Sequence, residues 1–567
     1  MIVFKKPFTL HYIIIIYSFL VIILLFIILR YNAQVMESCD SKIYCQGSLL
    51  DTIQRAKIFN DSKSFVDLAQ RKSPSVTLKH FESLMEETGN HPSYAQVKSF
   101  IDNNFEFQGE LVPWTPTDYT ENPQFLTKIK NTTVADFAKK LNTVWLTLAR
   151  KVNTSVYKFP DRHSIIYLPE GFVIPGGRFK EVYYWDTYWI IKGLLISGMT
   201  DTARGMLNNF VSLIRRFGFI PNGTRVYYLN RSQPPLLSAM VGIYFNYTND
   251  KKWVKKNIDA IETELLWWLQ NRAVTVKKQG TEYRLAQYSV KSGTPRPESY
   301  SEDIETCRAF DYYEKIKCYK NLKSGAESGW DFSSRWLVGS DGSISLKLED
   351  IDVIGIVPVD LNAFLCGGFG QISRFYKMLG NAWQSKKWRK REQVWMDGIS
   401  RVLYDSKDGT WYDWDINLSK PRRGFFPSNL SPLFTESFEP HMKEYYGRRA
   451  IEYLDKNNID SFKGGIPTSL LQTGQQWDYP NAWPPLQDMI VTGLLNTKIP
   501  AGIEKARLYA IYSLDAYITG FRTTSEMFEK YDASVSGQYG GGGEYTVQTG
   551  FGWTNGAALS FIKLLYL

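Results

Sequence analysis

The feature that most constrains the fold is a regular alternation of apolar helical segments with connections of two lengths. From about residue 187, segments with helical spacing of apolar residues come in pairs joined by short links, and long connections rich in Gly, Pro, Tyr and Arg separate the pairs. In a ring of antiparallel helices, this alternation places all the long connections at one end. The sequence therefore predicts an all-α toroid with little strand, and a solenoid of helical hairpins is the alternative.

The boundaries of the helices follow from the same pattern. We expect helices over residues 187–198, 203–218, 236–248, 253–272, 358–379, 383–404, 487–497 and 504–520, with a very long connection over 273–357. The sequence "TDT" at residues 200–202 offers a capping residue for the second of these helices.

Composition excludes one class of partner and leaves another open. Aromatic residues make up 15% of the 567-residue chain, which suits a protein that binds carbohydrate but also suits a large helical core. The formal charge of +10 comes from dispersed Lys and Arg with only short clusters, whose ordinary interpretation is the solvated face of a helix. We therefore do not expect a nucleic-acid partner.

The N-terminal residues predict a membrane anchor. Residues 13–29 form an uncharged apolar run that is preceded by Lys5 and Lys6 and followed by no small-residue cleavage site. We interpret 1–12 as a cytoplasmic N-terminus, 13–29 as an uncleaved signal anchor, and 30–567 as a folded domain on the extracellular or lumenal side of a type II membrane protein. Cleavage followed by secretion is the alternative.

Acceptor asparagines and cysteines agree with that compartment. Asn-x-Ser/Thr sites occur at Asn60, Asn131, Asn153, Asn222, Asn230, Asn246, Asn417 and Asn429. The spacing of the cysteines suggests two local disulfides, Cys39 with Cys45 and Cys307 with Cys318, and leaves Cys366 free. No His lies near any cysteine, so we expect neither a metal nor a cofactor.

The long connections carry the candidate site. Charged residues and aromatic rings recur together in "PGGRFKEVYYWD", "PNGTRVYYLNRSQ", "GTPRPESYSED", "ESGWDFSSRW", "QQWDYPNAWPP" and the segment from "EKYD" to "GFGWTNG", and four of the six contain Trp. A surface loop without chemistry explains any one of them, but surface loops are usually poor in Trp. Six such clusters on one rim predict a pocket for a sugar, whose apolar faces stack on rings and whose hydroxyls need charged partners.

Individual residues in these clusters have two interpretations. Arg178, Arg231 and Arg296 are either ordinary salt-bridge residues or planar donors to sugar hydroxyls and to the carboxylates that hold them. Asp331 is either a helix cap or, beside Trp330 and Phe332, a partly desolvated carboxyl group that suits a proton donor.

These motifs resemble the trehalase family of inverting glycoside hydrolases. The signatures Pro-Gly-Gly-Arg-Phe-x-Glu-x-Tyr-x-Trp-Asp-x-Tyr at 175–188 and Gln-Trp-Asp-x-Pro-x-Ala-Trp-Pro-Pro at 476–485 are complete, and "GGGGEY" and "GFGWTNG" are also similar to the family. The resemblance spans roughly residues 39–567. It implies an (α/α)₆ barrel and hydrolysis of α,α-trehalose to two glucose molecules.

The resemblance also implies roles for particular residues. Asp331 in "SGWDFS" corresponds to the general acid and Glu529 in "EKYD" to the general base, with Glu544 as the rival base on the residues alone. Substrate contacts are implied for Arg178, Trp185, Asp186, Asn222, Arg231, Gln233, Arg296, Glu298, Gly329 and Glu544. Because Asn222 and Asn230 then lie in the pocket, we do not expect them to be glycosylated. Another α/α-barrel glycosidase that acts on glucans and a catalytically silent trehalose sensor are the competing hypotheses.

Overall fold

The structure is a computed structural model that describes residues 39–107 and 109–567. The predicted anchor at 13–29 and the segment before it lie outside the described residues. Among the residues described, no helix is long and apolar enough to cross a membrane.

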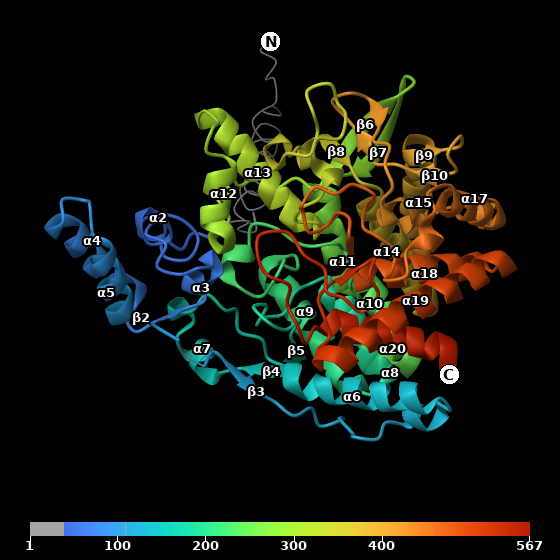
Figure 1. Ribbon diagram of the computed structural model, residues 1–567, viewed down its shortest axis with the longest axis horizontal. Coiled ribbons are helices and arrows are strands. Elements are labelled where there is room, and N and C mark those ends of the chain that lie inside the picture. Colours follow the sequence, from blue (N-terminus) through green and yellow to red (C-terminus); the bar gives the residue numbers. More distant parts are fainter. Residues whose placement is uncertain (1–38, 108) are drawn as a thin grey trace, which may run out of the picture.

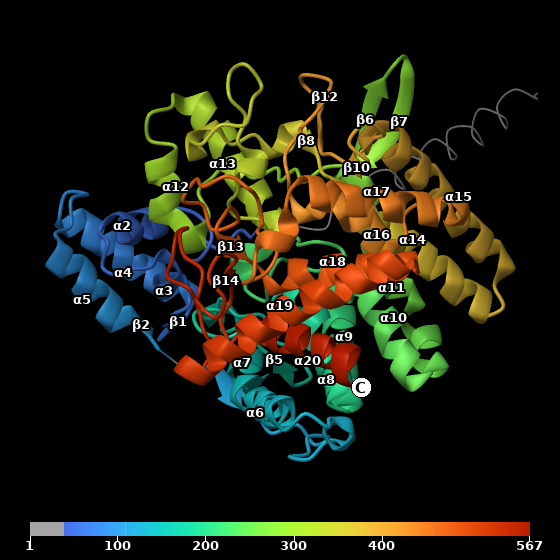
Figure 2. The same cartoon turned by 45° about the vertical axis from the view of Figure 1, so that its right-hand side comes forward.

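Six helices of the described chain contact one another in a closed ring. In ring order they are α8 (Asp186–Ile196), α10 (Leu237–Thr248), α14 (Val359–Met378), α16 (Ser431–Thr435), α18 (Pro484–Thr497) and α20 (Gly552–Tyr566). A second set packs around them: α6 (Thr132–Leu148), α9 (Thr200–Phe217), α11 (Lys251–Asn271), α15 (Ala382–Gly398), α17 (Lys443–Lys456) and α19 (Pro500–Thr524) (Figures 1 and 2). This arrangement is consistent with the predicted (α/α)₆ barrel.

The two sets of helices differ in sequence as their positions require. Helix α8 is apolar on nearly all faces and buries ten of its eleven residues, as expected of a helix surrounded by others. Helix α9 instead carries Arg215 and Arg216 on its less buried face. Helices α8 and α20 approach closely because Gly193 and Gly556 face each other, and a Cβ at Gly556 would lie 2.0 Å from the Trp189 carbonyl oxygen.

The sequence missed part of this architecture. The connection predicted over 273–357 contains a hairpin of β6 (Ala273–Lys278) and β7 (Thr281–Ala286), followed by α12 (Tyr300–Thr306) and α13 (Tyr312–Ser328). Helices α6, α16, α17 and α20 were also not predicted.

The predicted local cap of α9 is wrong. The residue before this helix, Met199, makes no side-chain cap. The carboxylate of Asp118 instead accepts hydrogen bonds from the backbone N–H groups of Asp201 and Thr202, at 2.7 and 2.9 Å.

Residues 48–106 form a separate lobe that we call the N-terminal lobe. It contains α2 (Ser48–Arg55), α3 (Ser62–Val66), α4 (Pro74–Glu87) and α5 (Tyr94–Asn104), with β1 (Ala69–Gln70) paired to β2 (Phe105–Glu106). Its apolar side chains pack in a cluster of their own that also takes in Tyr183, Tyr227 and Tyr228 from loops of the ring. The lobe lies beside the ring of helices in Figure 1.

The remaining elements are short. They are α7 (Thr154–Lys158) and the strands β3 (Leu111–Pro113), β4 (Ala149–Val152), β5 (Phe172–Val173), β8 (Ile356–Val357), β9 (Tyr404–Asp405), β10 (Thr410–Trp411), β11 (Trp414–Asp415), β12 (Lys420–Pro421), β13 (Asn481–Ala482) and β14 (Tyr531–Asp532). The prediction of low strand content is confirmed.

Both predicted disulfides are confirmed. Cys39 bonds to Cys45 and Cys307 bonds to Cys318, and the free Cys366 is buried.

The asparagines of the Asn-x-Ser/Thr sites differ in solvent exposure. Asn222 and Asn429 are buried, whereas the exposed ones are Asn60, Asn131, Asn246 and Asn417.

Candidate active site

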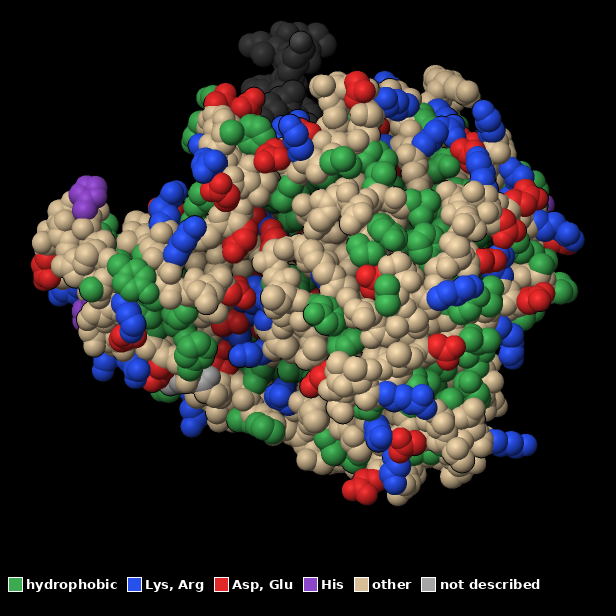
Figure 3. Space-filling model, in the orientation of Figure 1, with side chains coloured by type: hydrophobic (Ala, Val, Ile, Leu, Met, Phe, Trp, Pro, Cys, Tyr) green, Lys and Arg blue, Asp and Glu red, His purple; other side chains and the backbone are tan. Residues whose placement is uncertain are grey.

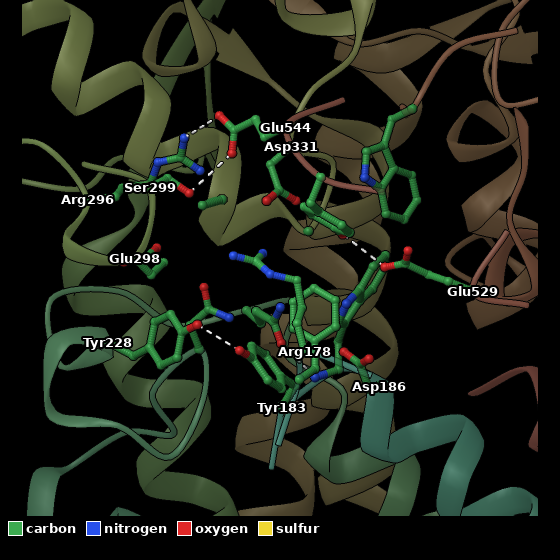
Figure 4. Close-up of a pocket in the computed structure, with 18 of the residues that line it drawn as sticks. Arg178, Tyr183, Asp186, Tyr228, Arg296, Glu298, Ser299, Asp331, Glu529 and Glu544 are labelled. Atoms are coloured by element: carbon green, nitrogen blue, oxygen red, sulfur yellow. Dashed lines mark hydrogen bonds and ion pairs between the residues drawn. The ribbon is translucent and has the colours of Figure 1, made fainter. Parts of the chain in front are cut away.

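One cavity of about 650 Å³ collects residues from five of the connections that lead from a helix of the second set to the next ring helix. All twelve residues predicted for the site line it: Arg178, Trp185, Asp186, Asn222, Arg231, Gln233, Arg296, Glu298, Gly329, Asp331, Glu529 and Glu544. Seven of them are labelled in Figure 4: Arg178, Asp186, Arg296, Glu298, Asp331, Glu529 and Glu544. In the space-filling view, acidic side chains lie in a hollow beside the N-terminal lobe (Figure 3).

Asp331 follows the end of α13. It is not a helix cap, because the residue that closes α13 in the left-handed conformation is Gly329, with φ 76°. The flanking side chains of Trp330 and Phe332 are buried. Enclosure by protein raises the pKa of the Asp331 carboxyl to about 7, and the charge of Glu544 adds to the rise, while Arg296 opposes it.

Glu529 is almost fully buried and has neutral hydrogen-bond partners. Its Oε1 accepts from the Tyr545 hydroxyl at 2.9 Å, and its Oε2 lies 3.4 Å from the Gln548 backbone N–H (Figure 4). Burial raises the pKa of Glu529, and the neighbouring Lys530 ammonium limits the rise. Asp186, also buried, has its pKa raised well above the ordinary value by burial and by Glu529.

Glu544 has a different setting. Its carboxylate accepts from Arg296 Nη2 at 2.7 Å and from the Ser299 hydroxyl at 3.2 Å (Figure 4). Glu544 is thus held by a cation, and Glu529 by a phenol. The structure therefore distinguishes two carboxylates that the residue pattern alone left equivalent.

Each of the three predicted arginines donates to at least one carboxylate. Arg178 makes a two-pronged contact with Asp61 at 2.9 and 2.7 Å. Arg296 donates to Asp303 as well as to Glu544. These contacts with carboxylates fit both interpretations of the arginines.

Arg231 keeps one donor unused. Its Nε donates to the Asn222 side-chain oxygen at 2.7 Å and its Nη2 to Glu298. The pKa of Glu298 stays below its ordinary value because Arg231 and Arg296 outweigh the effect of burial. Arg231 Nη1 and Glu298 Oε2 are buried and have no hydrogen-bond partner among the described residues. Buried polar atoms are rarely left unpaired, so this pair is suited to a polar ligand.

Aromatic rings form the other part of the wall. The indoles of Trp477 and Trp483 are stacked with ring centroids 3.8 Å apart, and Trp185 and Trp553 meet edge to face at 6.0 Å. Gly329 permits this packing, since a Cβ there would lie 2.8 Å from the Trp185 ring. The cavity therefore offers both flat apolar surface and fixed polar groups.

Sequence reasoning missed several residues of the site. Tyr545, Ser299 and Phe179 line the cavity, and Asp61 holds Arg178 from the N-terminal lobe. Tyr545 directly follows the predicted Glu544, which is the one local signal that could have found it. Asp61 lies 117 residues before Arg178 and carries no such signal.

A helical ring whose loops bring carboxylates, arginines and tryptophans around one cavity defines a carbohydrate-cleaving enzyme, a glycoside hydrolase. The family model for trehalase matches residues 57–566 of this chain. The chain therefore belongs to the trehalase family, and it is a glycoside hydrolase.

Relatives and a solved structure agree with this placement. The chain is 50% identical to the trehalase of Tenebrio molitor over 540 residues, covering 95% of this chain and 97% of that protein. It is 44% identical to the trehalase of Homo sapiens over 526 residues, covering 92% and 89%. The neutral trehalase of Saccharomyces cerevisiae has a similar fold, with a TM-score of 0.55, 21% identity, and coverage of 70% of this chain and 74% of that one.

Proposed function

We propose that this protein hydrolyses α,α-trehalose to two glucose molecules with inversion, using Asp331 as general acid and Glu529 as general base. Membership of the trehalase family supports the substrate. The observation that carries the assignment of roles is the pKa of Asp331, raised to about 7 by enclosure in the pocket. A carboxyl group with that pKa is about half protonated at neutral pH and is able to donate.

The reaction is a single displacement. Asp331 protonates the glycosidic oxygen as the bond to the anomeric carbon breaks. Glu529 takes a proton from a water molecule, which attacks the anomeric carbon from the opposite face of the ring. We expect the two carboxyl groups to be roughly 6.5 to 9.5 Å apart, the separation that leaves room for this water.

The choice of Glu529 over Glu544 as the base rests on their partners. Glu544 is occupied by Arg296 and by the Ser299 hydroxyl, which hold its two carboxylate oxygens. Glu529 is buried beside a neutral phenol, and its raised pKa suits a general base. In this scheme, Glu544 binds a sugar hydroxyl.

The other predicted residues bind the disaccharide. The unpaired atoms Arg231 Nη1 and Glu298 Oε2 supply a donor and an acceptor for sugar hydroxyls. The Trp185 ring supplies an apolar face. The remaining contacts come from residues that line the same cavity: Arg178, Asp186, Asn222, Gln233, Arg296 and Gly329.

Proton NMR of the first products tests the proposal. Inversion yields one α-glucose and one β-glucose from each trehalose, whereas two α-glucoses mean retention and contradict the mechanism. Faster hydrolysis of maltose or starch than of trehalose would favour a glucan-cleaving enzyme. Absence of glucose release would favour a sugar sensor.

We also propose that the domain predicted over 30–567 acts outside the cytosol. Two disulfides and the exposed acceptor asparagines support an oxidising compartment. Endoglycosidase treatment should lower the apparent mass of protein made in a secretory host, and replacing Asn60, Asn246 and Asn417 by Gln should lower the mass in the same way. An unchanged mass would contradict the proposal.

A further inference from the structure

Next to Glu529 in the chain, Lys530 is a fully buried lysine that the proposed mechanism does not use. Its ammonium group donates to the Gln476 side-chain oxygen at 2.8 Å and to the Gly542 carbonyl at 3.4 Å. It also lies 5.0 Å from the centre of the Trp483 ring. Among the described residues, no carboxylate lies within ion-pair distance of its nitrogen. Lys63, another buried lysine, instead pairs with two carboxylates.

Burying an unpaired ammonium group is costly, so its position calls for an explanation. Gln476, which receives the hydrogen bond, donates from its own amide to the backbone carbonyl of Asp331 at 2.6 Å. A chain of two hydrogen bonds therefore runs from Lys530 to the residue assigned as the acid. Lys530 also directly follows Glu529, the residue assigned as the base, in the sequence.

We propose that Lys530 is a positioning residue that acts through Glu529, keeping this carboxylate ionised while its bond to Gln476 fixes the segment that carries Asp331. The inference rests on the proposed role of Glu529 as the base. A positive charge stabilises a nearby carboxylate most strongly where water is excluded, as it is around Glu529.

The other charged and titratable groups around Glu529 do not replace this contribution. The Tyr545 hydroxyl, which donates to Glu529, is uncharged because burial raises its pKa further above the ordinary value. Asp186 is a carboxyl group whose own pKa Glu529 raises, and it supplies no positive charge. Arg178 assists, but it is already paired with Asp61. Burial lowers the pKa of Lys530 to about 8, so its charge is present at neutral pH and is lost above that value.

The pH dependence of kcat/KM on trehalose tests the inference. Glu529 must be ionised to act as a base, so its pKa sets the acid limb of the profile. Lys530→Gln removes the charge and keeps a polar side chain. We expect its acid limb to move to higher pH by about one unit, with roughly tenfold lower kcat/KM at pH values below the limb. Lys530→Arg should leave the limb in place.

Three controls keep the outcomes separate. Lys505, which is paired with Asp455 and Asp460 outside the cavity, is a matched lysine whose change to Gln should not move the profile. Lys530→Met is the second charge-removing variant should Lys530→Gln not fold. Suppose that Glu529→Gln is inactive but the acid limb stays in place in a folded Lys530→Gln or Lys530→Met variant. This result would overturn the inference about Lys530 and leave the assignment of Glu529 as the base intact. Full activity in Glu529→Gln would overturn both the base assignment and the inference.

Discussion

Two of the regions that hold carboxylates away from bulk water are the pocket and a group that we call the clamp cluster, which consists of Lys63, Asp67, Glu110, Glu181 and Arg225. In the clamp cluster, an oxygen of every carboxylate lies 3.2 Å or less from a nitrogen of Lys63 or Arg225. In the pocket, Asp331, Glu529 and Asp186 have no ion-pair partner among the described residues. The cluster joins the N-terminal lobe to the loops of the ring, and the pocket is open to a ligand.

One aspartate from each region shows this difference in the direction of its pKa shift. Burial alone would raise the pKa of Asp67, but Arg225 and Lys63 outweigh it, so the pKa is lowered. Asp331 lacks such a partner, and its pKa is raised to about 7. Paired carboxylates of this kind contribute to stability, whereas a carboxyl group with a raised pKa is prepared to exchange a proton.

The largest expected effect is loss of turnover when the pocket carboxylates are replaced. Asp331→Asn and Glu529→Gln each remove a proton-transfer group, so kcat should fall by roughly a thousandfold or more while the protein stays folded. Azide should restore activity to Glu529→Gln by replacing the attacking water, with β-glucosyl azide as product. Kinetics on trehalose with and without azide measures the loss and the recovery of activity, and circular dichroism checks that the variants are folded. Loss of activity in Glu544→Gln combined with full activity in Glu529→Gln would move the base to Glu544.

The opposite pattern is expected in the clamp cluster. Asp67→Asn leaves Lys63 and Arg225 less well paired and should lower the free energy of unfolding by about 3 kcal/mol, with kcat changed less than about threefold. Because the folded pKa of Asp67 is lowered, its contribution is present above the unfolded value and disappears as pH falls through the folded value. Urea denaturation at neutral and acidic pH measures this. A large fall in kcat without loss of stability would remove the distinction between the two regions.

A smaller effect is expected for the arginines that border the pocket. Replacing Arg178, Arg231 or Arg296 by Lys keeps the charge but loses the fork that holds the carboxylates. Each change should lower kcat/KM by on the order of tenfold, or about 1.4 kcal/mol of transition-state stabilisation. Arg448→Lys, at an exposed pair with Glu444, is the matched control and should be unaffected. Full activity in a Lys variant would assign that arginine a structural role.

Much of the ring was accessible from helical periodicity, which is a local signal, and the pocket residues were implied by the family resemblance that the dense motifs carry. Helix α16 was missed since it has only five residues, too few to show a period. Helix α17 was hidden by its polar composition, with Arg448 and Arg449 among many charged residues.

Contacts between distant segments could not be predicted in the same way. Asp118 caps α9 from 83 residues away, and Asp61 reaches Arg178 from the N-terminal lobe. Nothing in the spacing of either aspartate indicates its partner. The same holds for the pKa of Asp331, which depends on how completely the folded pocket encloses it.

The most direct test of the contrast between the two regions is the unfolding midpoint of Asp331→Asn as a function of pH. The folded pKa of Asp331 is about 7, and the unfolded value is about 3.9. Between these values the folded state binds the proton more tightly, so ionisation destabilises the wild-type protein as pH rises. The variant cannot ionise. At about pH 8 it should therefore unfold roughly 1 to 3 °C above the wild type, with the difference disappearing near pH 4. A lower midpoint for the variant at about pH 8 would show that Asp331 is a paired, stabilising carboxylate and would contradict the account.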